Sequence, residues 1–126
     1  MSQHHTIALP ALQSAIRQVV AGFGSSPEEV SAVANNLIEA NLTGHDSHGI
    51  GMLQRYAAAF LEGGLKANTH VKTVMDAGAL LRLDGDAGFG QVIGAEAMHI
   101  GIARAQQLGC CIVALGNAHH LGRIGA

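Results

Sequence analysis

The feature that most constrains the fold is a continuous apolar run at residues 110–115, Cys-Cys-Ile-Val-Ala-Leu. A short uninterrupted run of this kind is typical of a strand buried on both faces, inside a sheet that helices cover. Such a strand needs neighbours, and the sequence offers only one hairpin, from residues 71–74 and 79–83 with a turn at 76–78. We therefore expect an α/β chain that forms the front part of a longer protein.

Three helices are predicted before the hairpin, over residues 10–21, 26–43 and 49–61, because apolar residues recur there at helical spacing and glycines follow each segment. The second helix has the clearest start signal. Ser26 can accept a hydrogen bond from a free amide, and Glu29, three residues on, completes a capping box.

A fourth helix is predicted over residues 91–107, between the hairpin and the apolar run. Its inward face is expected to carry Val92, Ala95, Met98, Ile102 and Ala105. The predicted fold class is α/β, with amino-terminal helices followed by a mixed sheet that helices flank. We divide the chain into a helical part, 1–70, and the start of an α/β domain, 71–126.

Charged residues are scarce. They make up 13% of the chain, against about 25% in typical soluble domains, which predicts that further chain or a second subunit covers part of the surface. A net charge of -2 and 3% aromatic residues argue against nucleic-acid binding. No apolar run is long enough to cross a membrane, and the first residues are not typical of a secretory signal. Adjacent Cys110 and Cys111 are typical of buried thiols, so we expect a cytoplasmic protein.

Two glycine-flanked histidine loops are the candidate functional segments: Gly-His-Asp-Ser-His-Gly at 44–49 and Asn-Ala-His-His-Leu-Gly at 117–122. The second follows the predicted buried strand, and open sheets place their ligands at the carboxyl ends of parallel strands. Imidazole has an unperturbed pKa of about 6.5, so it can give and take a proton near neutral pH. These loops therefore favour general acid or base chemistry at a carbonyl or hydroxyl group.

Other interpretations of the histidines stay open. His45 and His48 could cap helix ends with the polar residues between them, or bind a metal at i, i+3 spacing. No metal is expected, because the sequence has neither a His-Glu-x-x-His motif nor a set of cysteine ligands. His119 and His120 would point to opposite sides of an extended segment, so at most one is expected to face the site.

The glycine-rich loop at 85–90 reads Gly-Asp-Ala-Gly-Phe-Gly, which is not the Gly-x-Gly-x-x-Gly fingerprint of Rossmann folds. Its two acidic residues would repel a pyrophosphate. We predict that it is a tight lead-in to the helix that follows. The sequence also contains neither a phosphate-binding P-loop nor the Gly-x-Ser-x-Gly elbow of serine hydrolases.

Three ordered motifs, at 44–50, 83–91 and 117–122, resemble the malate/L-lactate dehydrogenase family, which is unrelated to Rossmann-type dehydrogenases, and within it the hydroxycarboxylate dehydrogenase B type. The resemblance implies an unusual α/β nucleotide-binding fold, NAD or NADP as cofactor, interconversion of 2-hydroxy and 2-oxo acids, and a homodimer of longer chains. It also implies that the part from residue 71 onward begins the cofactor-binding domain.

The resemblance implies roles for individual residues. His48 matches the histidine that donates or accepts a proton at the substrate oxygen, and Ser47 is its neighbour in the site. His120 matches a second histidine beside the nicotinamide and substrate, assigned as the base in some relatives. Gly122 falls among the expected cofactor contacts.

One position departs from the family pattern. Many relatives have an arginine where this chain has Met52, and a thioether cannot replace the paired hydrogen bonds that an arginine makes to a carboxylate. Arg55, or a residue beyond Ala126, could supply that charge, although we expect Arg55 to lie on another face of its helix. Met52 predicts a more apolar pocket that accepts bulkier or aromatic 2-oxo acids.

The leading hypothesis is thus an NAD(P)-dependent 2-hydroxy acid dehydrogenase that acts on a small molecule and binds neither nucleic acid nor membrane. The 126-residue chain alone is expected to be inactive, because it lacks enough sheet to hold a nicotinamide. The alternatives are an inactive dimerisation piece, a ureidoglycolate- or diketogulonate-type oxidoreductase of the same family, and a hydrolase with a histidine-bound metal.

Overall fold

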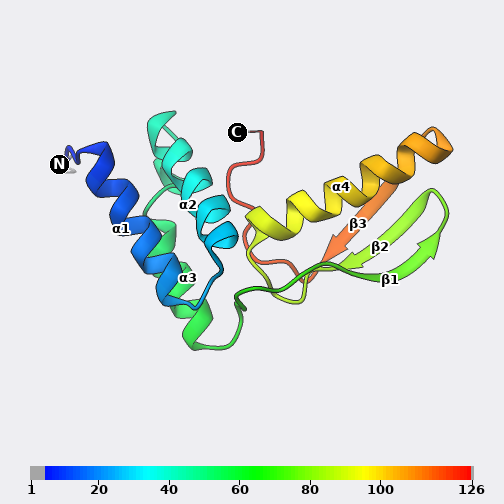
Figure 1. Ribbon diagram of the computed structural model, residues 1–126, viewed down its shortest axis with the longest axis horizontal. Helices are drawn as coiled ribbons and strands as arrows, with labels where there is room; N and C mark the ends of the chain where they lie inside the picture. The colour runs from blue at the N-terminus through cyan, green and yellow to red at the C-terminus, as the bar shows by residue number, and fades with distance from the viewer. Residues whose placement is uncertain (1–4, 126) are drawn as a thin grey trace.

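The computed structural model describes residues 5–125 and contains, within them, four α-helices, one 3-10 helix and three strands (Figure 1). In chain order these are α1 (Leu9–Gly22), α2 (Pro27–Leu42), η1 (Asp46–His48), α3 (Met52–Leu61), β1 (Lys72–Ala77), β2 (Leu80–Asp84), α4 (Gly90–Leu108) and β3 (Ile112–Gly116). Helices α1–α3 form one group, and α4 lies along the sheet. The predicted α/β class is confirmed. None of the helices in the described part is long and apolar enough to cross a membrane.

The start of α2 differs in one respect from the predicted capping box. Ser26 accepts the expected hydrogen bond from the Glu29 backbone, at 3.2 Å. The Glu29 side chain, however, does not turn back to Ser26: both its carboxylate oxygens accept from the backbone N–H of Asn68, at 3.0 and 3.1 Å. The Ser26 N–H donates instead to the Asn68 side chain. A tertiary contact has therefore replaced the local one, and it ties α2 to the segment that leads into the sheet.

This contact supports a stability prediction. Glu29 is only 4% exposed, so Glu29→Ala removes the acceptor of a partly buried N–H, and we expect the free energy of unfolding to fall by about 1–3 kcal/mol. Glu28→Ala is the matched control, because it removes an exposed carboxylate from the same helical turn. Urea unfolding of both variants measures the difference. Equal losses would show that helix-dipole charge, rather than the Asn68 contact, accounts for the effect.

The helical part has a core of its own. Its buried apolar side chains include Leu12, Ile16, Val20, Val33, Leu37, Leu53 and Tyr56. Phe89, directly before α4, joins this core, with its ring centroid 5.6 Å from that of Tyr56 in an edge-on arrangement. The helical core therefore fixes the amino-terminal end of α4. The division of the chain at residue 70 stays a prediction.

The spacing of apolar residues in α3 predicts one buried face that includes Leu53, Tyr56 and Leu61, but Leu61 does not lie on it. It is 85% exposed, whereas Tyr56 is fully buried. Five residues of an α-helix rotate the side-chain direction by about 140°, so Leu61 points away from the helices that cover Tyr56. The prediction for Leu61 was wrong.

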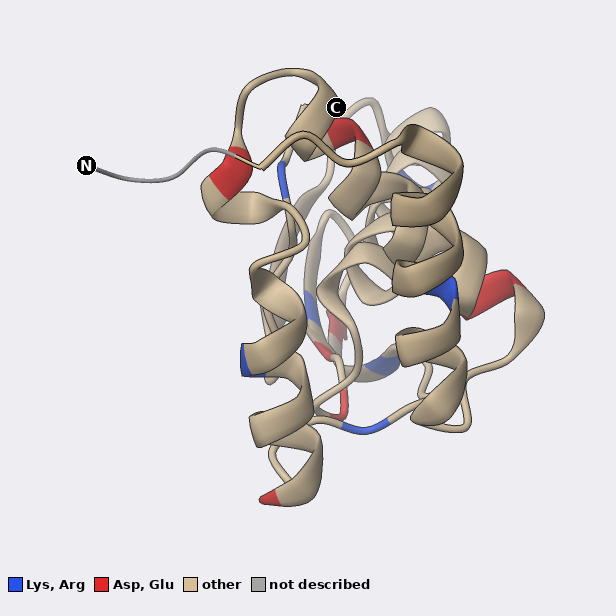
Figure 2. Cartoon of the chain, turned by 90° about the vertical axis from the view of Figure 1, so that its left-hand side faces the viewer, with Lys and Arg blue, Asp and Glu red and all other residues tan. Residues whose placement is uncertain are grey.

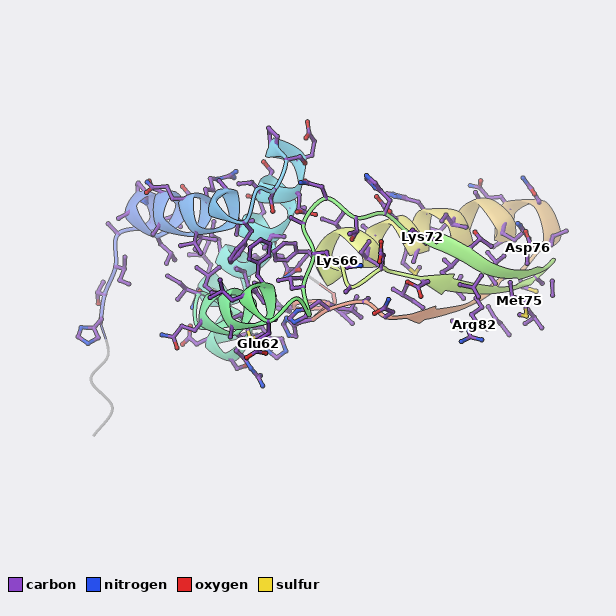
Figure 3. The ribbon with its side chains drawn as sticks, turned by 90° about the horizontal axis from the view of Figure 1, so that it is seen from below. Glu62, Lys66, Lys72, Met75, Asp76 and Arg82 are labelled. Carbon is purple, nitrogen blue, oxygen red and sulfur yellow. The ribbon has the colours of Figure 1, made fainter. Side chains whose placement is uncertain are left out.

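The sheet has the order β1-β2-β3 and is mixed: β1 pairs with β2 antiparallel, and β2 with β3 parallel. Helix α4 covers one face, and Met75 and Arg82 project from the other (Figure 3). Asp76 reaches α4 through an ion pair with Arg104. The alternation of apolar and polar residues at 71–74 predicts a half-buried strand, but all six residues of β1 are exposed. Alternation requires a covering layer over one face, and α4 packs over the central strand instead.

The buried face of α4 also differs from the prediction. Met98 and Ile102, expected to face inward, are 59% and 49% exposed. The buried positions are Gly90, Ile93, Ala97 and Gly101. A Cβ at position 101 would lie 2.8 Å from a methyl carbon of Val113 on β3. The small residues face the sheet because they let the helix approach it closely. A prediction based on hydrophobicity alone does not take side-chain size into account.

The apolar run at 110–115 forms a strand from Ile112 onward, largely as predicted, but this strand is not buried on both faces. Residues of β3 alternate between exposed and half-buried, and Ile112 is 66% exposed. Cys110 is exposed and Cys111 half-buried, so the buried-thiol prediction was wrong. The physical reason is that β3 has a single paired neighbour, β2, and a helix on one side only. Figure 2 marks the lysine, arginine, aspartate and glutamate positions, which are scattered among many uncharged ones.

Candidate functional site: a pair of imidazoles after β3

The segment 117–122 leaves the carboxyl end of β3 and carries the second histidine loop. Asn117 has a left-handed backbone, with φ of 50°, which turns the chain out of the strand. Its side-chain amide donates to Asp84 at 3.0 Å, and the backbone N–H of His119 donates to the Gly88 carbonyl at 2.9 Å. The loop between β2 and α4 therefore holds this segment in place.

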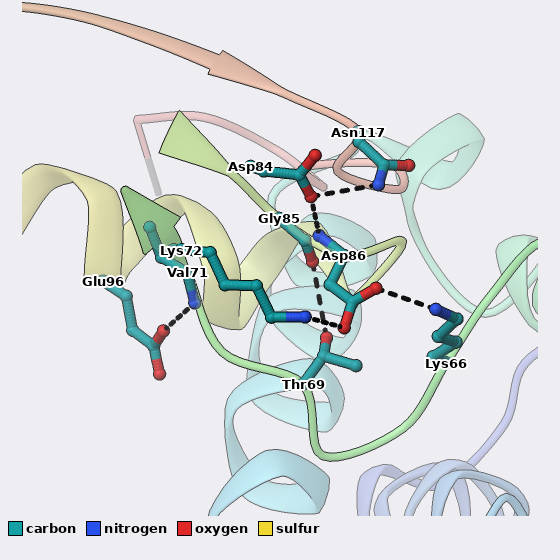
Figure 4. A network of polar contacts seen from close by, with 9 residues as sticks. All are labelled: Lys66, Thr69, Val71, Lys72, Asp84, Gly85, Asp86, Glu96 and Asn117. Carbon is teal, nitrogen blue, oxygen red and sulfur yellow. Dashed lines mark hydrogen bonds and ion pairs between the residues drawn. The ribbon is translucent and has the colours of Figure 1, made fainter. Parts of the chain in front are cut away.

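That loop is stabilised by a charge network (Figure 4). Lys66 and Lys72 each donate to one carboxylate oxygen of Asp86 at 2.7 Å. These two hydrogen bonds lower the pKa of Asp86 to about 2. The backbone N–H of Asp86 and the Asn117 amide lower the pKa of Asp84. The glycine-rich loop is thus the tight lead-in to α4 that the sequence predicted, and its charges support the histidine segment.

The first histidine loop forms η1 and is held by Asn41, on the last turn of α2. The Asn41 side chain accepts from the backbone N–H of Ile50 at 2.8 Å and donates to Asp46 at 2.8 Å. Gly49 is buried against the same side chain, which a Cβ at that position would meet. Sequence reasoning missed Asn41. A polar residue one turn before a functional loop was the available signal.

The two histidine loops meet in space. The ring centroids of His48 and His120 lie 5.2 Å apart. Both side chains line a cleft of about 510 Å³, together with Leu115, Asn117, Ala118, His119, Leu121, Gly122 and Ile124. Ser47, next to His48, places its hydroxyl oxygen 2.9 Å from the His48 Nδ1 atom. Within residues 5–125 no group of three or more His, Cys, Asp or Glu side chains is arranged to hold a metal ion.

The Nδ1 atom of His120 has two hydrogen-bonding neighbours, and a residue of α4 holds one of them. The Tyr56 hydroxyl of α3 lies 2.9 Å from its Nδ1 atom, and the backbone N–H of Gly122 donates to the same nitrogen at 3.2 Å. Gln91 of α4 donates to the Tyr56 hydroxyl at 2.8 Å. Sequence reasoning treated Tyr56 as a core residue only. The signal that could have identified it is that a buried tyrosine hydroxyl needs a hydrogen-bond partner.

The environment favours the uncharged forms of His119 and His120. Burial lowers the pKa of His120. Three neighbouring side chains that can carry positive charge lower it further: His48, His119 and Arg55. Burial also lowers the pKa of His119, again with help from Arg55. Both rings are therefore neutral at pH 7, where they can donate one hydrogen bond and accept another.

His119 also faces the site, contrary to the expectation that only one of the two adjacent histidines would. Its ring packs edge-on against Tyr56, with centroids 5.6 Å apart. Both His119 and His120 line the cleft described above and a second one. The expectation assumed an extended strand, and the left-handed turn at Asn117 ends the strand before these residues.

The second cleft has a volume of about 500 Å³ and contains the proposed substrate residues. It is lined by Met52, Arg55, Ala58, Ala59, Glu62, Ala118, His119 and His120. Arg55 therefore shares a cleft with Met52, and the prediction that it lies on another face was wrong. Residues three apart on a helix are neighbours on its surface, which explains the result.

Gly122 lines the first cleft, and the backbone conformation at this position requires a glycine. It is buried, with φ of 74°, and a Cβ would collide with the side chain of Asn36. No lysine or arginine is among the residues that line this cleft. Its walls are apolar side chains, the imidazoles of three histidines and the Asn117 amide, so they offer no lysine or arginine to bind a phosphate.

The chain is thus an α/β structure without a dinucleotide fingerprint, and two imidazoles lie close together in loops near the end of a parallel strand. The family model for malate/L-lactate dehydrogenase matches residues 7–126, so the chain belongs to this family. The resemblance seen in the sequence motifs is thereby confirmed.

Individual relatives cover almost all of this chain. It is 50% identical over 125 residues to hydroxycarboxylate dehydrogenase B of Escherichia coli strain K12, a match that covers 99% of this chain and 35% of that protein. It is 40% identical over 114 residues to a malate dehydrogenase of Pyrococcus abyssi, covering 90% and 32%. The solved structure of sulfolactate dehydrogenase from Methanocaldococcus jannaschii superposes with a TM-score of 0.83 at 34% identity, covering 94% and 35%. The chain thus spans about a third of the length of these relatives.

Proposed function

We propose that this chain supplies the proton-transfer residues of an enzyme that interconverts 2-hydroxy and 2-oxo acids with NAD or NADP. The observation that carries the proposal is the pair of imidazoles, His48 and His120, 5.2 Å apart in one cleft. Oxidation of a hydroxyl to a carbonyl removes a proton from oxygen and a hydride from carbon, so the site needs a group that titrates near neutral pH. Similar proteins named as malate and hydroxycarboxylate dehydrogenases add support.

His48 is the proposed proton carrier. Its Nδ1 atom contacts the Ser47 hydroxyl at 2.9 Å. A hydroxyl can donate or accept, so this contact is compatible with either protonation state of Nδ1. That leaves Nε2 to take the substrate hydroxyl proton in the oxidation direction and to return it in the reduction direction. Ser47 thus orients His48 without fixing its charge.

The nicotinamide cofactor, when bound, supplies the acceptor or donor of the hydride at C2 of the substrate. We assign its nicotinamide ring to the 510 Å³ cleft, beside His120 and Gly122. The apolar side chains Leu115, Leu121 and Ile124 would exclude water from that ring. These residues align the reacting groups, which is the main protein contribution in cofactor-dependent hydride transfer.

Arg55 is the proposed partner of the substrate carboxylate. It lies in the second cleft with Met52, next to His119 and His120. Met52 is 7% exposed and forms part of an apolar wall, so this cleft combines one cationic group with room for a carbon side chain. The proposal keeps bulkier or aromatic 2-oxo acids as preferred substrates.

The direct test is a substrate panel on the complete product of the gene that contains this sequence. Short, branched and aromatic 2-hydroxy acids are offered with NAD and with NADP, and the formation of reduced nicotinamide is followed by absorbance. We expect oxidation of at least one acid. No turnover with any pair would reject the proposal and favour a non-catalytic dimerisation role, and equal rates for aromatic and short acids would remove the role of Met52.

The variant Arg55→Ala is expected to raise the KM for the hydroxy acid about 10-fold or more, with a smaller change in kcat. A charge-assisted hydrogen bond contributes about 1.5–3 kcal/mol, which corresponds to this range. Arg82→Ala is the control, because Arg82 projects from the sheet face away from α4 (Figure 3). Steady-state kinetics measure both. An unchanged KM in Arg55→Ala would assign the carboxylate to another residue.

A homodimer in the cytoplasm and the division of the chain at residue 70 also belong to this proposal. Apolar side chains on the sheet support a covered surface: Val74 is 55% exposed, Leu80 47% and Ile112 66%. The 13% content of charged residues points the same way.

A further inference from the structure

We propose that Tyr56 is a positioning residue that holds His120 in one tautomer, with its proton on Nε2, so that His120 serves as a fixed hydrogen-bond donor and not as the base of the site. This inference rests on the proposed function, because it divides the proton chemistry of the cleft between two imidazoles. It also assigns a role to a residue that sequence motifs did not identify.

A backbone N–H determines whether the His120 Nδ1 atom carries a proton. The N–H of Gly122 lies 3.2 Å from it and can only donate. Nδ1 must therefore offer its lone pair, and a neutral imidazole that accepts at Nδ1 carries its proton on Nε2. Gly122 is buried, with a left-handed φ of 74°, so this N–H is held in one orientation.

Tyr56 adds a second donor to the same nitrogen. Its hydroxyl oxygen already accepts from Gln91 at 2.8 Å and lies 2.9 Å from Nδ1. Its own proton is therefore free to be donated to Nδ1. The phenol ring is fully buried and packs edge-on against Phe89 and His119, which leaves little freedom for the hydroxyl to turn elsewhere. Burial raises the pKa of Tyr56, so the hydroxyl keeps its proton at every pH of interest.

Protonation of His120 is opposed by its two hydrogen bonds and by three neighbouring side chains. A proton on Nδ1 would point toward the Gly122 N–H, so that two donors would face each other, and it would leave the buried Tyr56 hydroxyl without its acceptor. The titratable and charged groups around the ring come from η1, α3 and its own segment: His48, Arg55, Tyr56, Glu62 and His119. Among these, His48, His119 and Arg55 disfavour a positive His120.

The consequence is a division of labour. With Nδ1 occupied, His120 presents Nε2–H to the cleft and can orient a carbonyl, hydroxyl or carboxylate oxygen of the substrate by donation. It cannot accept a proton at Nε2 without first losing the one that it carries. His48, whose Nδ1 contact is a hydroxyl that suits either state, is left as the group that exchanges the proton.

The test is nitrogen NMR of histidine-labelled protein, which reports the tautomer and the pKa of His120 without any assay of activity. In the unaltered chain we expect an unprotonated, hydrogen-bonded Nδ1, a protonated Nε2 and a pKa below the usual 6.5. A protonated Nδ1 in the neutral ring would overturn the proposal, whatever the enzyme turns over.

Two changes to Tyr56 should move the pKa of His120 in opposite directions. Tyr56→Phe keeps the ring and removes the hydroxyl donor, so we expect the pKa to rise by about half to one unit. Tyr56 is the single tyrosine of the chain, and biosynthetic replacement by fluorotyrosine therefore strengthens this one donor and should lower the pKa. The fluorotyrosine protein also decides the matter if Tyr56→Phe does not fold.

Gln91→Met separates the tautomer from the orientation of the Tyr56 hydroxyl. It removes the donor to the Tyr56 oxygen but keeps the Gly122 N–H, which by itself requires an accepting Nδ1, so the tautomer should stay the same and the His120 pKa should rise less than in Tyr56→Phe. Should Tyr56→Phe leave the His120 pKa unchanged, or should fluorotyrosine shift it upward, Tyr56 has only a packing role. These results are independent of whether His48 carries the proton, which the turnover of a His48 variant decides.

Discussion

His48→Ala is expected to lower kcat of the complete enzyme by about 100-fold or more, the usual effect of losing a general acid or base. The imidazole is the group of the cleft whose remaining nitrogen is free to exchange a proton, since its Nδ1 contacts only the Ser47 hydroxyl among the described residues. The small alanine side chain leaves η1 intact, because that helix is held by Asn41 through Asp46 and Ile50. KM should change less than kcat, because binding of the carboxylate is assigned to Arg55.

His45→Ala is the matched control for this prediction. His45 belongs to the same loop and is exposed, but it lines neither of the two clefts beside His120. Its backbone N–H bond to Ala40 is preserved in the variant. We expect turnover within about two-fold of the unaltered enzyme, as for an ordinary surface substitution. Near-normal kcat in His48→Ala, or an equal loss in both variants, would contradict the assignment of His48.

The predicted helices and strands could be located from local signals. Ser26 and Pro27 start α2, and Gly109, with φ of 84°, ends α4. The burial of their faces could not be predicted as well. In α4 the face toward the sheet is chosen by size, because Gly101 permits the approach of Val113, while the larger Met98 stays exposed. Hydrophobic periodicity identifies the helix but cannot rank a glycine above a methionine as a buried residue.

The histidines of the candidate site could be predicted from the sequence, but the residues that hold them in place could not. Histidine clusters flanked by glycines are visible as motifs, and imidazole chemistry follows from the residue type. The Tyr56 and His120 partners are 64 positions apart in the chain, and no local spacing encodes such a contact. Arg55 was misplaced although helical spacing puts it beside Met52, three residues earlier on α3.

Gly90→Ala is expected to damage both stability and activity. Gly90 is the first residue of α4 and is buried under the second histidine loop, where a Cβ would collide with the backbone carbonyl groups of His119 and His120. A backbone atom cannot rotate away as a side chain can, so the loop must shift. Overpacking of this kind costs about 1–3 kcal/mol, which exceeds the gain of about 0.4–1 kcal/mol from a stiffer unfolded chain.

The shift should also reduce turnover about 100-fold, because a displacement of about 1 Å in a reacting group has an effect of that size. The His120 ring would move relative to Tyr56, so its NMR signals should change even where the fold persists. Gly22→Ala is the control: Gly22 is the last residue of α1, and a Cβ there meets nothing within 4 Å. That variant should be as stable as the unaltered chain or more stable by up to about 1 kcal/mol. Chemical denaturation of both proteins gives the comparison. Equal stabilities would mean that the backbone at His119 and His120 can shift at no cost, so that Gly90 does not hold His120 in place.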